Sequence, residues 1–322
     1  MNAVSFIAPV QEELKAVENM MRSQADGFNE DLRAALDLLI SAGGKRIRPA
    51  LTILTGKMFG APQDILKYVA VSIELLHTAT LVHDDLIDGS LLRRGMPTLN
   101  SRWSPGATVL TGDFIFARAA RMASDTNSTR VMNLFSHTLT VIVDGEIAQL
   151  LGSRCKADRD SYDKRIYAKT ASLFETSAKS AALISPVNND VVETMGRFGR
   201  DVGMAFQIID DILDFTGEQA TIGKPVGSDL RQGIVTLPAI LYAENHRDDP
   251  DAQYLLRGDC LESESMAIRL VDNIRRSDAI RRSHQEAAGY VESALEALRS
   301  LPAAPERFAL EDMANYIVQR EF

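Results

Sequence analysis

Apolar residues recur at every third or fourth position along most of the chain, which is the spacing of amphipathic helices. One stripe of this kind runs from Val69 through Ile73 and Leu76 to Ile87. Alternating β-branched runs between turn dipeptides are missing, so strands have little support. The pattern predicts an all-α protein, with helical stretches over residues 10–42, 64–88, 107–151, 160–185, 190–216, 229–246 and 261–300.

Glycine and proline interrupt this pattern at five places, where such residues end helices and form turns. The breaks are Gly43-Gly44, Gly60-Ala61-Pro62, Gly95-Met96-Pro97, Ser104-Pro105-Gly106 and Gly223-Lys224-Pro225. No linker or low-complexity tract divides the sequence. We therefore expect residues 1–322 to form a single large helical bundle.

The composition excludes several classes of partner. The chain has 35 basic and 44 acidic residues and a formal net charge of −9. So acidic a protein is a poor candidate for broad contact with nucleic acid, and any anion should bind in a local basic pocket. No apolar run approaches the roughly 20 residues that span a bilayer. The beginning of the chain lacks the basic region of a secretory signal.

The chain has only two cysteines, Cys155 and Cys260. They are too few for a disulfide-rich or zinc-binding fold, and they fit a reducing compartment in which thiols stay unpaired. Together with the absence of targeting signals, this predicts a cytoplasmic protein with at most peripheral membrane contact.

The same acidic motif, D-D-x-x-D, occurs twice, each time after apolar residues of a predicted helix. Its copies are Asp84, Asp85 and Asp88, and Asp210, Asp211 and Asp214. On a helix, the three carboxylates of each copy lie within one arc of about 100°. Like charges at this spacing repel, so a helix keeps them at low cost only where a cation neutralises them. A solvated acidic face would explain one copy, but two matching copies favour a bound cation.

Carboxylate oxygens suit Mg²⁺, which retains waters and shares its coordination sphere with substrate phosphates. Cations that could contact such phosphates occur in four segments: residues 43–49, Arg93-Arg94, Lys169-Thr170 and residues 223–225. Arginine matches phosphate oxygens bidentately and lysine supplies a point charge. Each segment alone would be typical of a solvated surface, but together they predict a site for metal and two diphosphates.

In this order, the motifs resemble those of the all-trans polyprenyl diphosphate synthases, which elongate isoprenoid chains head to tail. The resemblance covers residues 43 to about 241. It rests on GGKRIRP (43–49), HTATLVHDDLIDGSLLRRG (77–95), GD (112–113), GEIAQ (145–149), KTASLFE (169–175), GMAFQIIDDILD (203–214) and GKPVGSDL (223–230). The resemblance implies an isoprenoid-synthase-like fold, all-α around a central cavity, and a homodimer.

The resemblance also implies roles for the residues at matching positions. Three Mg²⁺ ions would be held by Asp84, Asp85 and Asp88 and by Asp210, Asp211 and Asp214. The allylic diphosphate would be bound by Arg93, Lys169 and Lys224, and isopentenyl diphosphate by Lys45, Arg48, His77 and Arg94. Thr170 and Gln207 would act with Lys169 in catalysis by directing oxygen dipoles at the carbocation.

One position departs from the family pattern. Family members often have lysine in the run D-L-x-x-G-K-x-T, where this chain has Ile234. The ring of cations around the diphosphates is then one charge short, unless Arg231 compensates.

Product length in this family depends on residues before the first aspartate motif. The resemblance places a first gate at Ala79 and Thr80, and Leu76 lies one helical turn deeper. One turn rises about 5.4 Å, roughly one extended isoprene unit. Because neither gate residue is bulky, we expect a long product of about C30 to C50.

Four alternatives stay open at this stage. The chain could be a geranylgeranyl or farnesyl diphosphate synthase whose tunnel floor lies on another helix. It could be a catalytically weak subunit of a heteromeric synthase, although both aspartate motifs are intact. A terpene cyclase has little use for a second diphosphate site, so Lys45, Arg48 and Arg94 argue against it. A purely structural bundle would leave both acidic motifs unexplained.

Overall fold

The computed structural model describes residues 5–93, 95–152, 155–217 and 226–320. Their packing divides the chain into two compact units. Unit 1 comprises residues 1–138, 173–196 and 298–312, and unit 2 comprises residues 139–172, 197–297 and 313–322. The expectation of one domain over the whole chain stays a prediction.

The elements are helical almost throughout, which confirms the predicted all-α class. The first part of the chain contains η1 (Ser5–Val10), α1 (Gln11–Ser23), α2 (Glu30–Ser41), α3 (Ile47–Met58), α4 (Gln63–Ile87), η2 (Leu99–Ser101), α5 (Pro105–Asp125) and α6 (Thr129–Leu151). The rest contains α7 (Arg159–Ile166), the π-helix η3 (Tyr167–Ala171), α8 (Ser172–Leu183), α9 (Asn189–Thr216), α11 (Ser228–Arg231), α12 (Leu237–Asn245), α13 (Pro250–Arg257), α14 (Glu264–Arg276), α15 (Ala279–Arg299) and α16 (Pro305–Val318).

Five of the predicted helical stretches are broken: residues 229–246 form α11 and α12, residues 261–300 form α14 and α15, residues 160–185 form α7, η3 and α8, and the other two are 10–42 and 107–151. Residues 10–42 form α1 and α2, because Gly27 adopts a left-handed backbone and the Asn29 side chain caps α2 at the Asp31 amide. Residues 107–151 form α5 and α6, because Asn127 is left-handed as well. Glycine and asparagine tolerate this conformation better than other residues. The apolar stripe continues across each break, so periodicity alone could not locate it.

A short antiparallel hairpin follows the first aspartate motif. Its strands are β1 (Leu92–Arg93) and β2 (Met96–Pro97), with Leu92 opposite Pro97. Gly95 has the positive φ that the turn requires. Each strand has only two residues, too few to show an alternating pattern, so the sequence did not predict this hairpin. It is the only sheet within the described residues.

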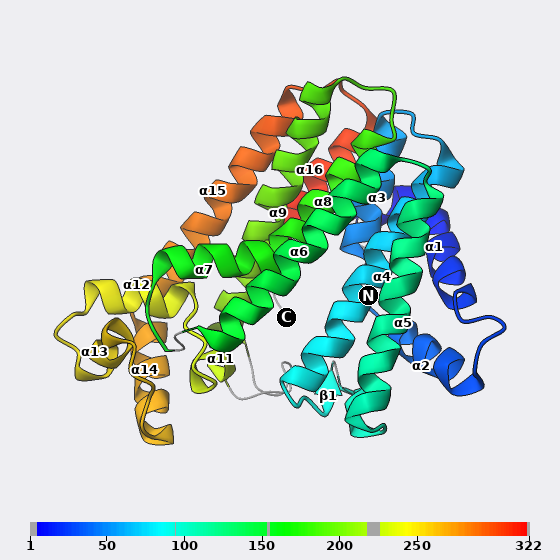
Figure 1. Cartoon of the computed structure of the whole chain (residues 1–322). Coiled ribbons are helices and arrows are strands. Elements are labelled where there is room, and N and C mark those ends of the chain that lie inside the picture. Colours follow the sequence, from blue (N-terminus) through cyan, green and yellow to red (C-terminus); the bar gives the residue numbers. More distant parts are fainter. Residues whose placement is uncertain (1–4, 94, 153–154, 218–225, 321–322) are drawn as a thin grey trace. The chain divides into compact units, whose positions relative to one another are not determined.

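In unit 1, α4 is the buried helix around which α1, α3 and α5 pack (Figure 1). Leu75, Leu76 and Val71 have no exposed surface, and most of the side chains between them are buried. This helix is also long and apolar enough to span a membrane, by its length and composition alone. The expectation that no segment reaches this length was therefore wrong. Two thirds of its most apolar stretch is buried (67%), as in the core helix of a folded domain.

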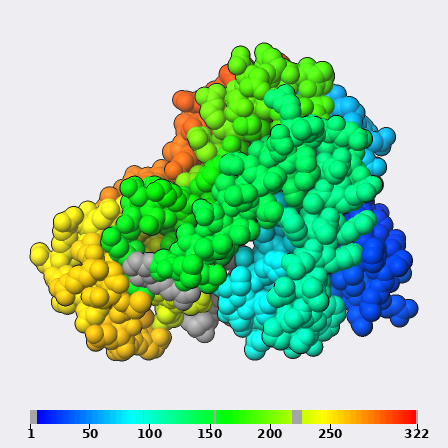
Figure 2. Space-filling model, viewed as in Figure 1, coloured from blue at the N-terminus to red at the C-terminus, as the bar shows by residue number. Residues whose placement is uncertain are grey.

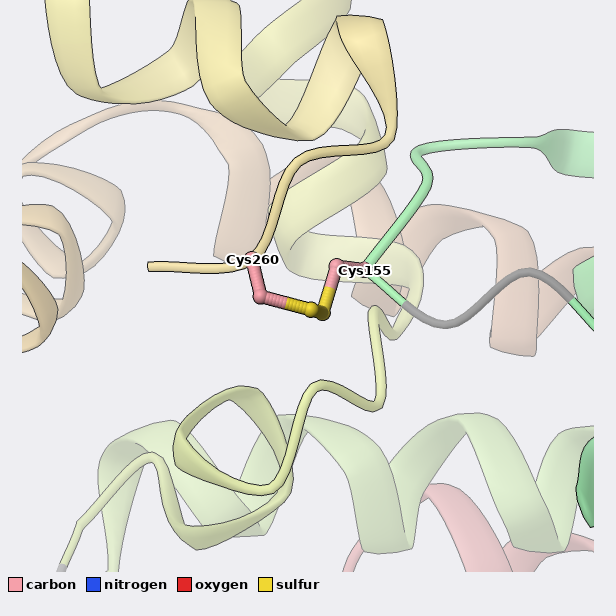
Figure 3. The surroundings of a disulfide bond; sticks show 2 residues. All are labelled: Cys155 and Cys260. Carbon is pink, nitrogen blue, oxygen red and sulfur yellow. A yellow bond between two sulfur atoms is a disulfide. The ribbon is translucent and has the colours of Figure 1, made fainter. Parts of the chain in front are cut away.

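A disulfide bond joins Cys155 and Cys260 in unit 2 (Figure 3). The prediction of two unpaired thiols is thus corrected. The fold brings the cysteines together across 105 residues of sequence, to a Cα–Cα distance of 5.0 Å. Main-chain hydrogen bonds from the Cys155 amide to the Gly233 carbonyl and from the Ala157 amide to the Leu255 carbonyl hold the segment around Cys155 beside the end of α11 and beside α13, which leads to Cys260.

Loss of this bond is expected to destabilise the protein. Because it closes a long loop, Cys155→Ser should lower the free energy of unfolding by about 2–5 kcal/mol. Urea unfolding with and without dithiothreitol measures the effect, and Cys260→Ser should match it. The double variant should be insensitive to dithiothreitol. Two alkylatable thiols in the denatured, unreduced wild type would contradict the pairing.

Candidate active site

The first aspartate motif ends helix α4. Asp84 and Asp85 lie in its last turn, and Asp88 is the residue that caps it. The chain leaves the helix through Gly89, whose φ is +62°, and the Ser90 amide donates to the Asp85 carbonyl. Asp85 is buried, whereas Asp84 is half-buried and Asp88 is exposed. The predicted helical face is therefore present, and its most accessible carboxylates are the outer two of the motif.

The second motif lies near the C-terminal end of α9. Carboxylates are unfavourable in the last turns of a helix, because the unpaired carbonyls there carry negative charge. Both motifs therefore combine mutual repulsion with an unfavourable helix end. A bound cation would remove both penalties.

Arg93 supplies part of this positive charge in the first motif. Its Nε lies 2.9 Å from both carboxylate oxygens of Asp85, and one terminal nitrogen lies 2.8 Å from Oδ1. The hairpin makes this pairing possible, since β1 carries Arg93 back beside the end of α4. Arg93 was predicted to bind an allylic diphosphate, which remains a prediction. Arg94 lies outside the described residues.

His83, next to the first motif, packs against the predicted GD segment. The ring lies 3.3 Å from the Val109 carbonyl and 3.5 Å from an Asp113 oxygen. A Cβ atom at Gly112 would clash with the ring. Glycine at this position therefore lets α5 approach α4 closely, just where the aspartates begin.

Three of the four predicted isopentenyl diphosphate residues are described, and they lie in one loop and on two helices of unit 1. Lys45 is exposed in the loop before α3. Arg48, in the first turn of α3, places its guanidinium 4.6 Å from the centre of the Phe174 ring. His77 is half-buried on α4, two turns before the first motif.

The predicted chain-length residues also lie on α4. Leu76 and Ala79 are buried, with 0% and 2% of their surface exposed. Thr80 is half-buried and its hydroxyl donates to the His77 carbonyl at 2.8 Å. A surface cavity of about 280 Å³ in unit 1 is lined by residues of α1, α3 and the start of α4, and by none of these residues.

Asp211, in the second motif, is the most deeply held carboxylate of the site. Its oxygens accept hydrogen bonds from the Tyr162 hydroxyl at 2.7 Å and the Gln207 amide at 2.9 Å. Burial raises the pKa of Asp211 to about 7, and the neighbouring charge of Asp229 adds to the increase. Tyr162 is itself buried, and the sequence analysis missed it because α7 is remote from α9 in sequence.

The other two aspartates of the second motif have different partners. Asp214 accepts hydrogen bonds from the Ser228 amide and hydroxyl and from the Asp229 amide, so it caps the start of α11. Asp210 accepts a 2.6 Å hydrogen bond from Arg320, near the end of the chain. The Arg320 guanidinium also stacks 4.3 Å from the Phe206 ring centre, and only 9% of this side chain is exposed.

Lys169 and Thr170 lie on the π-helix η3. Helical segments of this kind are frequent at functional sites. The Thr170 hydroxyl donates to the Gln207 amide oxygen at 2.6 Å, and Lys169 lies 2.8 Å from a Glu146 oxygen. A Cβ atom at Gly145 would clash with Ala168, so glycine lets α6 approach the π-helix. The three residues predicted to be catalytic, which include Gln207, thus share one neighbourhood of unit 2.

Two further sequence expectations concern residues 218–234. Lys224 lies outside the described residues. At the position where the family often has lysine, Ile234 donates its amide to the Asp229 carbonyl. Arg231 is paired with Glu264 at 2.6 Å, so its charge already has a partner.

The raised pKa of Asp211 makes stability depend on pH. The pKa of this carboxyl is about 7 in the folded chain, whereas it is about 4 in an unfolded chain. The folded chain therefore binds one more proton between these values, and the free energy of unfolding should fall as the pH rises through them.

Urea unfolding in EDTA, compared between wild type and Asp211→Asn, isolates this group. The variant should lose this component of the pH dependence and gain stability relative to wild type as the pH rises from about 5 to about 8. A wild-type-minus-variant difference that is the same at both pH values would contradict the assignment.

The residues fit Mg²⁺ better than a metal that needs a preformed cage. Within residues 5–93, 95–152, 155–217 and 226–320, no three His, Cys, Asp or Glu side chains converge as a closed set of ligands. Mg²⁺ does not require such a set, because it keeps several waters and takes further oxygens from substrate phosphates. Its usual protein ligands are one or two carboxylates, which each aspartate motif offers.

Comparison with known proteins identifies the class. Residues 29–271 match the polyprenyl synthetase family, so the chain belongs to that family. A heptaprenyl diphosphate synthase component 2 from Geobacillus stearothermophilus is 39% identical over 98% of this chain and 96% of its own length. Solanesyl-diphosphate synthase 2 of Oryza sativa subsp. japonica is 35% identical over 98% of this chain and 79% of its own length.

A solved structure agrees with this classification. The polyprenyl synthase of Caulobacter crescentus CB15, complexed with calcium and isoprenyl diphosphate, superposes with a TM-score of 0.90. It is 33% identical to this chain and the match covers 98% of this chain and 97% of that one. The family predicted from the aspartate and basic motifs is therefore confirmed.

Proposed function

We propose that the protein is a Mg²⁺-dependent, head-to-tail prenyltransferase. It condenses isopentenyl diphosphate with an allylic diphosphate to give an all-trans polyprenyl diphosphate of about C30 to C50. The observation that carries this proposal is the pair of aspartate motifs at helix C-terminal ends, in a chain that belongs to the polyprenyl synthetase family.

The carboxylates that would hold Mg²⁺ are those of the two motifs, Asp84, Asp85, Asp88, Asp210, Asp211 and Asp214, of which Asp84 and Asp88 are the more accessible in the first motif. Asp85 and Asp211 have strong partners in Arg93 and in Tyr162 with Gln207, so they orient the motifs as well as charging them. We expect three Mg²⁺ ions per active site, and calcium in the Caulobacter relative supports a divalent cation. Bound Mg²⁺ would stabilise the departing diphosphate and so favour ionisation of the allylic C–O bond.

The cationic side chains of this chain would bind the two diphosphates. We assign Arg93, Lys169 and Lys224 to the allylic substrate, and Lys45, Arg48, His77 and Arg94 to isopentenyl diphosphate. Lys45 is accessible to an anion because it is exposed in its loop. Arg93 can reach a phosphate by turning from Asp85, since more than a third of its side chain is exposed.

Thr170 and Gln207 would stabilise the positive charge that develops on the allylic carbon. Gln207 donates its amide N–H to Asp211, which leaves its carbonyl oxygen oriented by a fixed hydrogen bond from Thr170. An oriented dipole of this kind stabilises charge without reorganising during the reaction. The isopentenyl double bond attacks this carbon, and a proton is then lost to the released diphosphate.

The long product is supported by the residues before the first motif and by the relatives. Ala79 and Thr80 are both small side chains at the level where a bulky residue would block a growing tail, and heptaprenyl and solanesyl chains both lie within about C30 to C50. The shorter geranylgeranyl and farnesyl products are less favoured by these relatives.

We further propose that two copies of the chain form a homodimer through α6. Along this helix, Val143, Ile147, Leu150 and Leu151 form one stripe of exposed apolar side chains. Figure 2 shows that α6, in green, lies at the surface of the visible face. An apolar stripe of this kind, left in water, is typical of an interface. The name of the Geobacillus relative raises the alternative of a different partner chain.

Replacing Ile147 by arginine tests the dimer. The wild type should show twice the chain mass by light scattering, and Ile147→Arg should show the single-chain mass. Ile268→Arg is a matched control, because Ile268 on α14 is equally exposed (48% against 49%). A single-chain mass for the wild type would contradict the homodimer and favour a second, different subunit.

The activity itself is tested with labelled isopentenyl diphosphate, farnesyl diphosphate and Mg²⁺. Products are extracted, dephosphorylated and separated by chain length. A discrete polyprenol of C30 or longer is expected. A product that stops at C20 would support the proposed reaction but overturn the long-chain assignment. The absence of product from any allylic starter would overturn the proposed function.

A further inference from the structure

We propose that Arg46 is a positioning residue for isopentenyl diphosphate, which acts by holding the loop that carries Lys45 and Arg48. This inference rests on the proposed function, since it concerns the same substrate. Arg46 lies within the basic segment at residues 43–49, yet the structure gives it a different environment from its two cationic neighbours.

The guanidinium of Arg46 is directed into unit 1, where it contacts three helices. Its Nε donates to Glu18 on α1 at 2.8 Å, and Nη1 donates to Glu74 on α4 at 2.8 Å. Its Nη2 donates to the main-chain carbonyl of Ile40 on α2 at 2.7 Å. Only 13% of the side chain is exposed, and only 6% of that of Glu74. With every nitrogen of its planar fork engaged, Arg46 is poorly placed to bind substrate itself.

The backbone of Arg46 explains what these contacts achieve. Its φ is +47°, a left-handed conformation that is unfavourable for a residue with a side chain. Such a conformation persists where the surrounding structure holds it. Arg46 is also the residue immediately before α3, so its conformation sets the direction in which the helix begins.

Fixing this one residue places both of its cationic neighbours. Lys45 precedes it in the exposed loop, and Arg48 follows it in the first turn of α3. The Arg48 guanidinium lies against the Phe174 ring, and that contact depends on where α3 starts. The basic segment therefore has two parts: Lys45 and Arg48 are the residues proposed to bind the substrate, and Arg46 determines their separation and orientation.

The contacts also require arginine rather than any cation. Glu74 is buried, and a buried carboxylate is costly without a partner. Lysine would restore one positive charge but not a planar fork that reaches three acceptors on three helices. Arg46→Lys should therefore keep the fold while loosening the loop.

The test compares Arg46→Lys with the double variant Arg46→Gln/Glu74→Gln, which removes the buried charge together with its partner and so preserves folding. The KM for isopentenyl diphosphate should rise about tenfold or more in both, with kcat and the KM for farnesyl diphosphate within about twofold of wild type. Calorimetric titration with isopentenyl diphosphate should show binding weakened by the same factor.

Arg307→Lys is the matched control. Arg307 is as buried as Arg46 (16% exposed) and also contacts a glutamate and a main-chain carbonyl, but it lies on α16, away from the basic segment in sequence. The Arg307→Lys variant should leave the KM values for isopentenyl diphosphate and for farnesyl diphosphate unchanged. Wild-type binding of isopentenyl diphosphate by the Arg46 variants, or a parallel rise of both KM values, would overturn the positioning role. A wild type that neither binds isopentenyl diphosphate nor forms product would instead overturn the proposed function.

Discussion

Replacing Asp84 and Asp85 together by alanine is expected to lower turnover by about three orders of magnitude or more. The change removes two of the three carboxylates at the end of α4, where a cation offsets both their repulsion and the negative helix end. The fold should survive, because Asp84 is half-buried and Arg93, freed from Asp85, is exposed enough to turn to water. Product formation and thermal unfolding measure the two effects separately.

Asp64→Ala is the matched control for this experiment. Asp64 is an exposed carboxylate in the first turn of the same helix, so the variant changes the charge of α4 but not the motif. It should keep wild-type turnover. The double variant should also lose the increase in Tm that Mg²⁺ and a diphosphate give the wild type. Near wild-type turnover in the double variant would contradict the metal assignment at the first motif.

Replacing Ala79 by phenylalanine is expected to shorten the product by several isoprene units. The side chain would occupy the level about one turn before the first motif, where the growing tail is predicted to pass. Because Ala79 is 2% exposed, the larger ring also costs stability, typically about 1–3 kcal/mol for overpacking. The distribution of product lengths, measured at equal enzyme stability, separates the two consequences.

Thr80→Phe keeps this prediction testable if Ala79→Phe folds poorly. Thr80 is half-buried, so a larger side chain is better accommodated there, and the resemblance places it at the same gate. Ala79→Ser, a small change at the first position, should leave product length unchanged. If both phenylalanine variants make the wild-type product, chain length is set by another helix.

The helices that could be predicted closely are those with a long apolar stripe and clear ends. The stretch predicted at 64–88 is α4 at Gln63–Ile87, and that at 190–216 is α9 at Asn189–Thr216. Both are bounded by residues whose local chemistry ends a helix, such as Gly89. The breaks at Gly27 and Asn127 could not be placed, because a single left-handed residue barely disturbs the periodicity around it.

The candidate site could likewise be predicted only in part from the sequence. The aspartate motifs are visible in the sequence because five consecutive positions contain the whole pattern. Arg93 and Gln207 also stand out in the sequence, but which side chain pairs with which aspartate does not. Tyr162 contacts Asp211 across 49 residues of sequence, and Arg320 contacts Asp210 across 110. Nothing local to Tyr162 distinguishes it from a core tyrosine, and the resemblance of residues 316–320 to the family's tail did not indicate that Arg320 pairs with Asp210.

The sequence by itself determined the helical class, the two clusters of carboxylates and the family to which the chain belongs, because each depends on residue types at short, fixed spacings. Only the tertiary structure decided which carboxylates are held by other side chains, that Cys155 and Cys260 are paired, and that Arg46 serves the fold while Lys45 remains accessible. Those properties depend on contacts between residues far apart in the chain, so they cannot be predicted from residue types at local spacings.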